Sequence, residues 1–240
     1  MLATLDRPTV ADSPCVVKPW RLITEQGIQS GPVKGSDTRS LTQFPQSELR
    51  YGLPENWELK LFPPNYNIAT LRGPGDNRVM GFGDTAFGVK HQFGTLSGFT
   101  FAADTKITIP TGRTAFSDGG IEANVQGIIG YNITPKLGIS GMVGVSTLTR
   151  RGDDGRITRF ASINPDVVVT YQINDSLQIY SELYGNTVTA PHQGPNLSYQ
   201  GGVQYLLTKS IEVDLSGGGV LRGPAGLPSR YINAGLGLLF

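Results

Sequence analysis

Hydrophobic and polar residues alternate along most of this chain. In the segment 99–109, Phe99, Phe101 and Ile107 share one face, whereas Asp104 and Lys106 share the other. The same period of two recurs in the segments that follow, and helical spacing does not fit these windows. Strict alternation over this many residues predicts β-strands with two chemically unlike faces.

Twelve such segments can be drawn. They are 20–28, 48–53, 57–61, 81–93, 98–109, 119–132, 136–148, 161–173, 177–187, 197–207, 211–221 and 230–240. Short connections (54–56, 94–97, 133–135, 174–176 and 208–210) alternate with long ones (29–47, 62–80, 110–118, 149–160, 188–196 and 222–229). Tight turns at one rim and long loops at the other predict an all-β, up-and-down antiparallel transmembrane barrel of about 12 strands. We expect residues 20–240 to form this barrel and residues 1–19 to form a separate N-terminal segment.

The charged residues of these strands all share the polar face when each strand's phase is set from its aliphatic residues. They are Arg21, Glu25, Glu48, Arg50, Glu58, Lys60, Asp84, Lys90, Asp104, Lys106, Glu122, Asp166, Glu182, Glu212 and Asp214. A period of two does not say which face meets solvent. A soluble barrel or sandwich would turn the apolar face inward, whereas a membrane barrel turns it toward lipid.

Three features favour lipid on the outside. Twelve strands enclose more space than side chains readily fill, since about eight already suffice to hold a small ligand. Apolar-face aromatics lie beside the short turns, at the position of an interfacial girdle, and they are Phe93, Tyr131, Tyr171 and Tyr205. The final amphipathic strand closes with Phe240, as in the assembly signal of bacterial outer-membrane barrels.

Composition excludes several other classes. Charged residues make up 16% of the chain, below the usual share of about 25%. The net charge of +1 argues against a strongly basic nucleic-acid binder. One cysteine excludes an intramolecular disulfide scaffold and a Cys-based zinc cage. The first six residues lack the basic and apolar regions of a signal peptide, so we expect either a cytosolic chain or one that begins near a mature end.

Several motifs resemble a known family. They are Leu-Asp-Arg-Pro-Thr-Val-Ala-Asp-Ser-Pro at 5–14, Leu-Arg-Tyr-Gly-Leu-Pro-Glu-Asn-Trp-Glu-Leu at 49–59, Gly-Asp-Thr-Ala-Phe-Gly-Val-Lys at 83–90 and Asn-Pro-Asp-Val-Val-Val-Thr-Tyr at 164–171. With the C-terminal hairpin, they resemble the outer-membrane transporters described as "MetA-pathway of phenol degradation", over nearly the whole chain. The resemblance implies a channel of the bacterial outer membrane that passes small solutes, including aromatic or other organic compounds. It supplies no catalytic residues, and a signal sequence is missing here.

The polar face is where transport chemistry would lie. The candidate pore-lining residues are Tyr180, Glu182, Tyr184, Asp104, Lys106, Glu122, Lys90, Asp166, Glu212 and Asp214. The polar face carries ten acids and five bases, so we expect an open pore to prefer cations. Tyr180, Glu182 and Tyr184 are our candidates for a constriction. The alternative is a lumen whose charges are satisfied by internal ion pairs, such as Asp104 with Lys106.

The segment before the first strand has two interpretations. Asp6, Arg7 and Pro8 could enter the lumen as a plug and pair with its charges, or they could belong to a disordered periplasmic tail. Cys15 follows Asp-Ser-Pro, which is not a lipoprotein cleavage box, so we expect no lipid anchor.

Enzymatic activity is the least favoured class. Some twelve-stranded barrels are phospholipases, but His91 lies on the lipid-facing phase beside a short turn and His192 lies in a Pro/Gly loop. No Gly-x-Ser-x-Gly elbow is present. We expect no cofactor and no metal. The expected partners are membrane lipid, a small-molecule solute, and the outer-membrane assembly machinery through the strand that ends in Phe240. A non-transport barrel with a plugged lumen is the alternative function.

Overall fold

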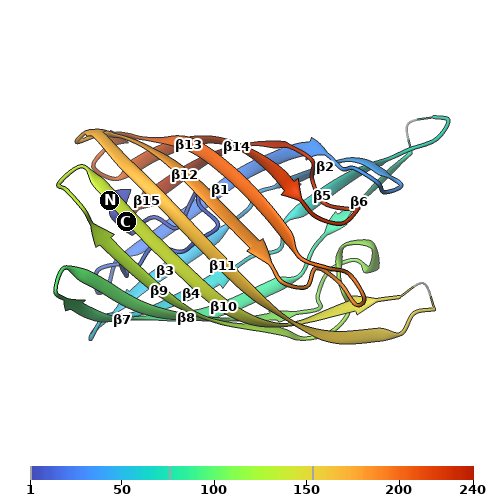
Figure 1. The fold of residues 1–240 in the computed structure, drawn as a ribbon, viewed down its shortest axis with the longest axis horizontal. Coiled ribbons are helices and arrows are strands. Elements are labelled where there is room, and N and C mark those ends of the chain that lie inside the picture. The colour runs from blue at the N-terminus through green and yellow to red at the C-terminus, as the bar shows by residue number, and fades with distance from the viewer. Residues whose placement is uncertain (1, 76, 153) are drawn as a thin grey trace.

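The computed structural model describes residues 2–75, 77–152 and 154–240, and the strands among them form one antiparallel sheet (Figure 1). The described strands are β1 (Leu22–Pro32), β2 (Thr38–Phe44), β3 (Glu48–Leu53), β4 (Trp57–Phe62), β5 (Tyr66–Leu71), β6 (Arg78–Phe82), β7 (Thr85–Leu96), β8 (Phe99–Ile109), β9 (Glu122–Asn132), β10 (Leu137–Arg151), β11 (Ile157–Asn174), β12 (Leu177–Asn186), β13 (Asn196–Thr208), β14 (Ile211–Arg222) and β15 (Tyr231–Leu239). Two short 3-10 turns are η1 (Leu2–Thr4) and η2 (Thr114–Phe116). None of the described helices is long and apolar enough to cross a membrane.

The strands close into a barrel because β15 pairs with β1 as well as with β14. Twelve strands form the closed ring, and β2, β5 and β6 continue β3, β4 and β7 toward the long-loop rim after short breaks. The predicted twelve-stranded, up-and-down barrel is therefore confirmed. Both termini lie at the same end of the barrel in Figure 1, beside the short turns.

Two of the predicted long loops are wrong. The ranges 29–47 and 62–80 contain the end of β1 together with β2, β5 and most of β6. Proline and glycine in these ranges suggested irregular structure, but Pro45, Pro63 and Pro64 fall at short breaks between strands, Pro32 ends β1, and Pro74 lies in the turn between β5 and β6. On the far side of each break the backbone pairs with its neighbour again, for example Thr42 with Ile68.

The apolar face of the sheet is the exposed one. Val125 and Val143 are each 58% exposed, whereas Glu25, Arg50 and Lys90 have no exposed surface. Aromatic contacts gather on the outside near the short turns, including Trp57 against His91 with ring centroids 4.2 Å apart. A barrel with apolar residues outside and charges inside is suited to lipid outside and a polar lumen. Arg21 precedes β1 and is exposed, and Asp84 lies in the break before β7, so neither belongs to a strand as predicted.

Candidate functional site

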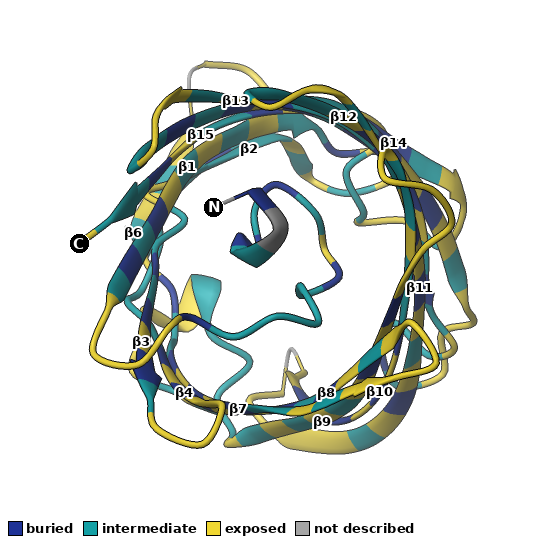
Figure 2. Cartoon of the chain, turned by 90° about the vertical axis from the view of Figure 1, so that its left-hand side faces the viewer, coloured by how far each residue is buried: buried dark blue, intermediate teal, exposed yellow. Residues whose placement is uncertain are grey.

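Residues 2–19, here called the luminal segment, lie inside the barrel. Figure 2 looks down the lumen and shows this part of the chain coiled within the ring of strands. Leu2, Leu5 and Val17 pack with Ile23 of β1. Ala11 packs in a second apolar cluster with wall residues that include Tyr180 of β12. The luminal segment therefore has its own small core against the wall.

Asp6 of the luminal segment contacts three buried bases at once. Its carboxylate lies 3.2 Å from Nη1 of Arg50, 3.0 Å from Nζ of Lys60 and 3.0 Å from Nζ of Lys90. These bases stand on β3, β4 and β7, which are neighbours in the wall. The alternating phase of three adjacent strands thus brings three positive charges to one point of the lumen.

Wall acids surround the same bases. Arg50 pairs with Glu25 at 3.0 Å and with Glu58 at 2.7 Å. Lys60 pairs with Glu48 at 3.0 Å and with Asp104 at 2.8 Å. The wall thus neutralises Arg50 and Lys60 before Asp6 is counted, whereas Lys90 pairs with Asp6 itself. With the luminal segment in place, the ion-pair network holds more acids than bases.

Asp12 is a second carboxylate that the luminal segment adds to this network. Its Oδ2 lies 2.9 Å from Nζ of Lys60 and accepts a hydrogen bond of 2.8 Å from Gln126. Burial acts to raise the pKa of the Asp12 carboxyl, but the nearby ammonium groups of Lys60 and Lys90 hold that pKa well below its ordinary value. Asp12 therefore remains charged inside the lumen at neutral pH.

Other luminal acids accept hydrogen bonds from the backbone of the luminal segment. Glu182 accepts the N–H groups of Val10 and Ala11, both at 2.8 Å. Glu25 accepts the N–H of Arg7 at 2.6 Å. An irregular buried segment leaves backbone donors that need partners. Carboxylates of the wall satisfy these donors, and the luminal segment is held by its backbone as well as by its charges.

Arg7 extends to the opposite side of the network. Its guanidinium contacts Asp214 of β14 at 3.3 Å and donates to Asn233 of β15 at 2.7 Å. Its own carbonyl accepts a hydrogen bond of 2.8 Å from Gln204 of β13. The luminal segment is therefore bonded to strands on both sides of the lumen.

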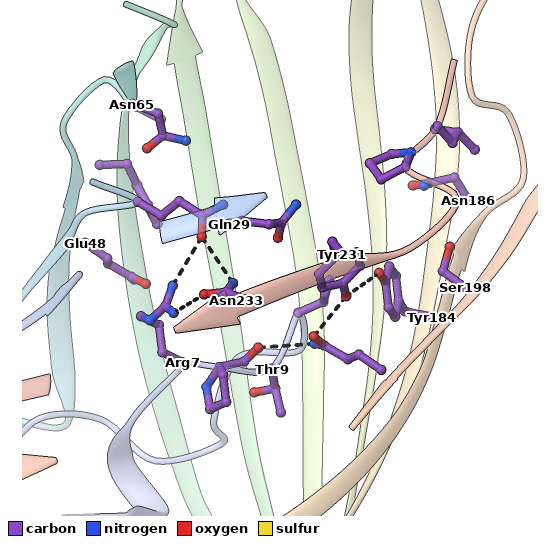
Figure 3. Close-up of a pocket in the computed structure, with 18 of the residues that line it drawn as sticks. Arg7, Thr9, Gln29, Glu48, Asn65, Tyr184, Asn186, Ser198, Tyr231 and Asn233 are labelled. Carbon is purple, nitrogen blue, oxygen red and sulfur yellow. Dashed lines mark hydrogen bonds between the residues drawn. The ribbon is translucent and has the colours of Figure 1, made fainter. Parts of the chain in front are cut away.

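A cavity of about 590 Å³, here called the vestibule, lies between the luminal segment and the long-loop rim. Its floor is Arg7, Pro8, Thr9 and Val10. Uncharged amides and hydroxyls dominate its wall, and they are Gln29, Gln46, Ser47, Asn65, Thr108, Tyr184, Asn186, Asn196, Ser198, Gln200, Tyr231 and Asn233. Figure 3 shows the two tyrosines and the asparagines facing the same space.

A chain of hydrogen bonds fixes one side of the vestibule. The hydroxyls of Tyr184 and Tyr231 are 3.0 Å apart, and the Tyr231 hydroxyl donates to Oε1 of Gln200 at 3.0 Å. Gln200 in turn donates to the carbonyl of Pro8 at 3.2 Å and to the carboxylate of Glu182. This network couples the vestibule wall directly to the luminal segment (Figure 3).

Two further cavities lie around the luminal segment. One of about 280 Å³ is lined by Thr9, Asp12 and residues near the short turns such as Tyr131 and Lys136. The other, of about 300 Å³, is lined by Asp12 together with wall residues. Thr9 lines both the vestibule and the short-turn cavity, so the luminal segment is the partition between the two ends of the lumen.

The predicted pore-lining residues lie on the inner face, but at different levels. Tyr180 and Glu182 are buried under the luminal segment, whereas Tyr184 lines the vestibule. The rest divide between the ion-pair network (Lys90, Asp104, Asp214), the 300 Å³ cavity (Lys106, Glu122) and buried positions (Asp166, Glu212). Asp104 pairs with Lys60, and no ion pair with Lys106 is present among the described residues. A role in passage stays a prediction for all ten.

Sequence reasoning missed the uncharged part of the site. Tyr231, Asn233 and Gln200 were not selected because only charged residues, with the tyrosines beside one of them, were considered. A signal was available: Tyr231 and Asn233 alternate with the lipid-facing Ile232, on the polar phase of the last strand. Extending the same phase rule to amides and hydroxyls would have found them.

The histidines show no catalytic arrangement. His91 lies between Trp57 and Phe93 on the outer face, with centroids 4.2 and 4.9 Å away. His192 lies in the loop between β12 and β13, with a φ of 65°. Among the described residues, no group of three or more His, Cys, Asp or Glu side chains is placed to hold a metal ion.

Comparison with known proteins gives a consistent picture. The family model described as "Putative MetA-pathway of phenol degradation" matches residues 16–225. The COG4313 outer membrane channel from Pseudomonas putida F1 is similar in structure, with a TM-score of 0.75 and 12% identity over 97% of this chain and 100% of that one. The NanC porin has a TM-score of 0.61 and 15% identity, over 90% of this chain and 98% of that one. The TodX monoaromatic hydrocarbon channel has a TM-score of 0.50 and 9% identity, over 93% of this chain and 90% of that one.

The search of curated protein sequences gives no match. At these identities, the structural likenesses establish the fold, which is that of outer-membrane barrels.

Proposed function

Because the chain belongs to the MetA-pathway of phenol degradation family, we propose that it is an outer-membrane channel for small, neutral organic solutes that carry a hydroxyl group. The structurally similar proteins include channels and a porin, and one is named as a channel for monoaromatic hydrocarbons. Both the family description and that name support an aromatic solute.

The observation that carries this proposal is the lining of the vestibule. Its volume of about 590 Å³ lies within the range of about 300–1,000 Å³ that is usual for small-molecule sites. Tyr184, Tyr231 and several amides can both donate and accept hydrogen bonds, as a phenolic hydroxyl requires. The charged residues that line the vestibule are two bases and two acids, Arg7, Lys106, Glu48 and Asp84, so its lining carries no net formal charge and favours a neutral solute over an ionised one.

The luminal segment gates passage in this proposal. It partitions the lumen, and the vestibule contacts it through Gln200 and Pro8. Solute therefore continues toward the short-turn rim only when the contacts of Asp6, Arg7 and Asp12 with the wall are loosened. The channel acts without catalysis, and its outer face contacts the lipid of the bacterial outer membrane. Assembly there uses the C-terminal strand that ends in Phe240.

Current through single channels in planar bilayers tests both parts of this proposal. We expect phenol to shorten the open events of the wild-type channel, because it occupies the vestibule. Tyr231→Phe should weaken that block by about fivefold, since one hydrogen bond contributes about 1 kcal/mol. Tyr199→Phe, on the outer face of β13, is the matched control and should leave the block unchanged. If phenol blocks both variants equally strongly, the solute does not bind in the vestibule on its way through the channel.

A second function is favoured by one feature, which is the number of contacts that hold the luminal segment. A barrel whose lumen stays closed would serve a structural or surface-interaction role. It would show no conductance under any condition, including after Asp6 is replaced. Conductance that rises on that replacement supports the channel instead.

A further inference from the structure

The charges of the chain are sorted between the lumen and the long-loop rim. This rim is the end of the barrel opposite the two termini in Figure 1, and its loops and adjoining strand ends are 33–41, 71–79, 110–121, 149–160, 187–196 and 221–230. Along the sequence, these regions carry ten of the thirteen arginines, and eleven bases against five acids in all. The net charge of +1 is therefore the balance of an acidic lumen and a strongly basic outer rim.

Two of these arginines lie on the outer face of the barrel wall. Arg151 ends β10 and pairs in register with Ile157 of β11, which is 46% exposed. Arg159 follows Ile157 by two residues on the same strand, so its side chain points to the same side of the sheet. Diagonal neighbours on one face of an antiparallel pair are about 7–8 Å apart. The two arginines are therefore close enough to contact one anionic group.

The level of these arginines along the wall matches the outer edge of the apolar band. Tyr171, in the aromatic girdle beside the short turns, lies twelve residues from Arg159 on β11. At about 3.3 Å per residue and a tilt of about 40°, this separation corresponds to a height of roughly 30 Å. The outward residues between them are all uncharged, and they are Ala161, Ile163, Pro165, Val167 and Val169. Because the apolar band of an outer-membrane barrel is about 25 Å tall, the arginines stand where the lipid headgroups begin.

The segment 119–121, just before β9, holds both guanidinium groups in place. Arg159 donates to the Ile121 carbonyl at 2.9 Å. Arg151 lies against Gly119, where a Cβ would overlap with the guanidinium, and it also donates to the Gly155 carbonyl at 3.4 Å. A guanidinium has five N–H donors, so these bonds use a minority of the donors of each group. The two side chains, here called the arginine pair, therefore form one cationic site that is ordered before any ligand binds.

The neighbouring bases have carboxylate partners, whereas the arginine pair has none among the described residues. Arg150 lies 3.6 Å from Asp118, and Arg156 lies 3.6 Å from Asp154. Two adjacent positive charges repel each other, and an external anion placed between them would stabilise both. The face below the arginine pair is aliphatic and exposed. The site therefore suits a ligand that joins an anionic group to an apolar portion.

We propose that the arginine pair binds a phosphate group of lipopolysaccharide in the outer leaflet of the outer membrane. The long loops of such barrels face the cell exterior, and the lipid A of that leaflet carries phosphate on its sugars. Arginine matches phosphate oxygens with two parallel hydrogen bonds. The acyl chains of the same molecule pack on the exposed Ile121, Ile157 and Ile163. The site anchors the hairpin of β10 and β11 in the leaflet, and it does not depend on whether the lumen conducts.

Native mass spectrometry of the folded chain in detergent tests this site. The probe is lipid A with both phosphates, and the comparison is phosphatidylglycerol, an anionic phospholipid. The test variant is Arg151→Gln with Arg159→Gln. Its matched control, Lys136→Gln with Lys209→Gln, removes two exposed charges from the short-turn rim. Arg151→Lys with Arg159→Lys keeps both charges but lacks the planar fork of arginine, and it supplies a second measurement if the glutamine variant impairs folding.

We expect lipid A to bind the wild type, and the glutamine variant to bind it about tenfold more weakly, because hydrogen bonds to a charged phosphate are lost. The affinity of the lysine variant should lie between these two, and the control should match the wild type. Equal lipid A affinity in the wild type and in either arginine variant would overturn the proposal. So would equally tight binding of phosphatidylglycerol, which would assign the site to anionic lipids in general, or displacement of lipid A by excess inorganic phosphate, which would assign it to free phosphate.

Discussion

Replacing Asp6 with asparagine tests whether the luminal segment is an electrostatic gate. Asp6 contacts Arg50, Lys60 and Lys90 within 3.2 Å, and all three bases are buried. Among the described residues, the ion pair of Lys90 is with Asp6 alone. Asp6→Asn keeps the shape of the side chain and removes its charge, so the ammonium of Lys90 loses its direct counter-charge while the luminal segment stays in place.

The size of the effect follows from that uncompensated charge. Removing one partner of a buried ion pair costs about 3–5 kcal/mol. Lys90 regains hydration when the luminal segment leaves the lumen, so the cost falls on the closed state and not on the open one. At the lower limit of about 3 kcal/mol, the ratio of open to closed channels should rise by roughly 150-fold, since 1.36 kcal/mol is a factor of ten.

Single-channel recording measures this ratio directly as the open probability. Asp175→Asn, in the exposed turn between β11 and β12, changes the same side chain outside the lumen and is the matched control. Asp6→Asn combined with Lys90→Met removes both charges, and should return the open probability toward the wild-type value. The mobility shift on heating during gel electrophoresis reports that each variant has folded.

An open probability that is the same in folded Asp6→Asn and in the wild type would refute the electrostatic gate. A rise in Asp6→Asn that Lys90→Met fails to reverse would also refute the assignment to this pair, and would point to the backbone contacts of the luminal segment instead.

Three further outcomes are expected. Val143→Arg should impair folding into bilayers by about 2–4 kcal/mol, because Val143 faces lipid, whereas Ser140→Arg on the inner side of the same strand should cost far less; the reverse order in a urea folding assay would contradict the assigned faces. The pKa of the Asp12 carboxyl is held below its ordinary value of 3.8 in the closed channel. The charged Asp12 therefore stabilises the closed state fully above pH 3.8, and this stabilisation is lost as the pH falls through the lowered pKa. Asp12→Asn should abolish this acid-induced component of opening in recordings at low pH. Glu182→Gln should raise the open probability because it weakens acceptors for the luminal segment. Glu212→Gln is the matched control: its fully buried carboxyl has no hydrogen-bond partner among the described residues, so the variant should change neither the open probability nor the reversal potential in a salt gradient.

The barrel architecture follows from local patterns along the chain. Lipid and the lumen are unlike environments, so the polarity of each side chain indicates which face of the sheet it occupies. The resulting period of two is visible in the sequence without knowledge of any contact. Strand number, the alternation of short and long connections, and the inward direction of Glu25, Arg50 and Lys90 all follow from that local rule. Proline hid the continuation of two strands, at Pro45 and at Pro63-Pro64. The residues that break a strand can be recognised locally, whereas the pairing beyond the break depends on the neighbouring strand.

The occupant of the lumen, in contrast, depends on contacts between distant parts of the chain. The luminal segment has an ordinary composition, and the sequence left it open whether these residues form a plug or a tail. Its partners are remote in the chain, as in the bond from Val10 to Glu182, which are 172 residues apart. The sequence also grouped Tyr180, Glu182 and Tyr184 as neighbours on one strand. The strand carries them to different levels of the lumen, and the Tyr231 hydroxyl that meets Tyr184 comes from the last strand. Closure of the barrel sets these distances, and no short-range pattern in the sequence encodes them.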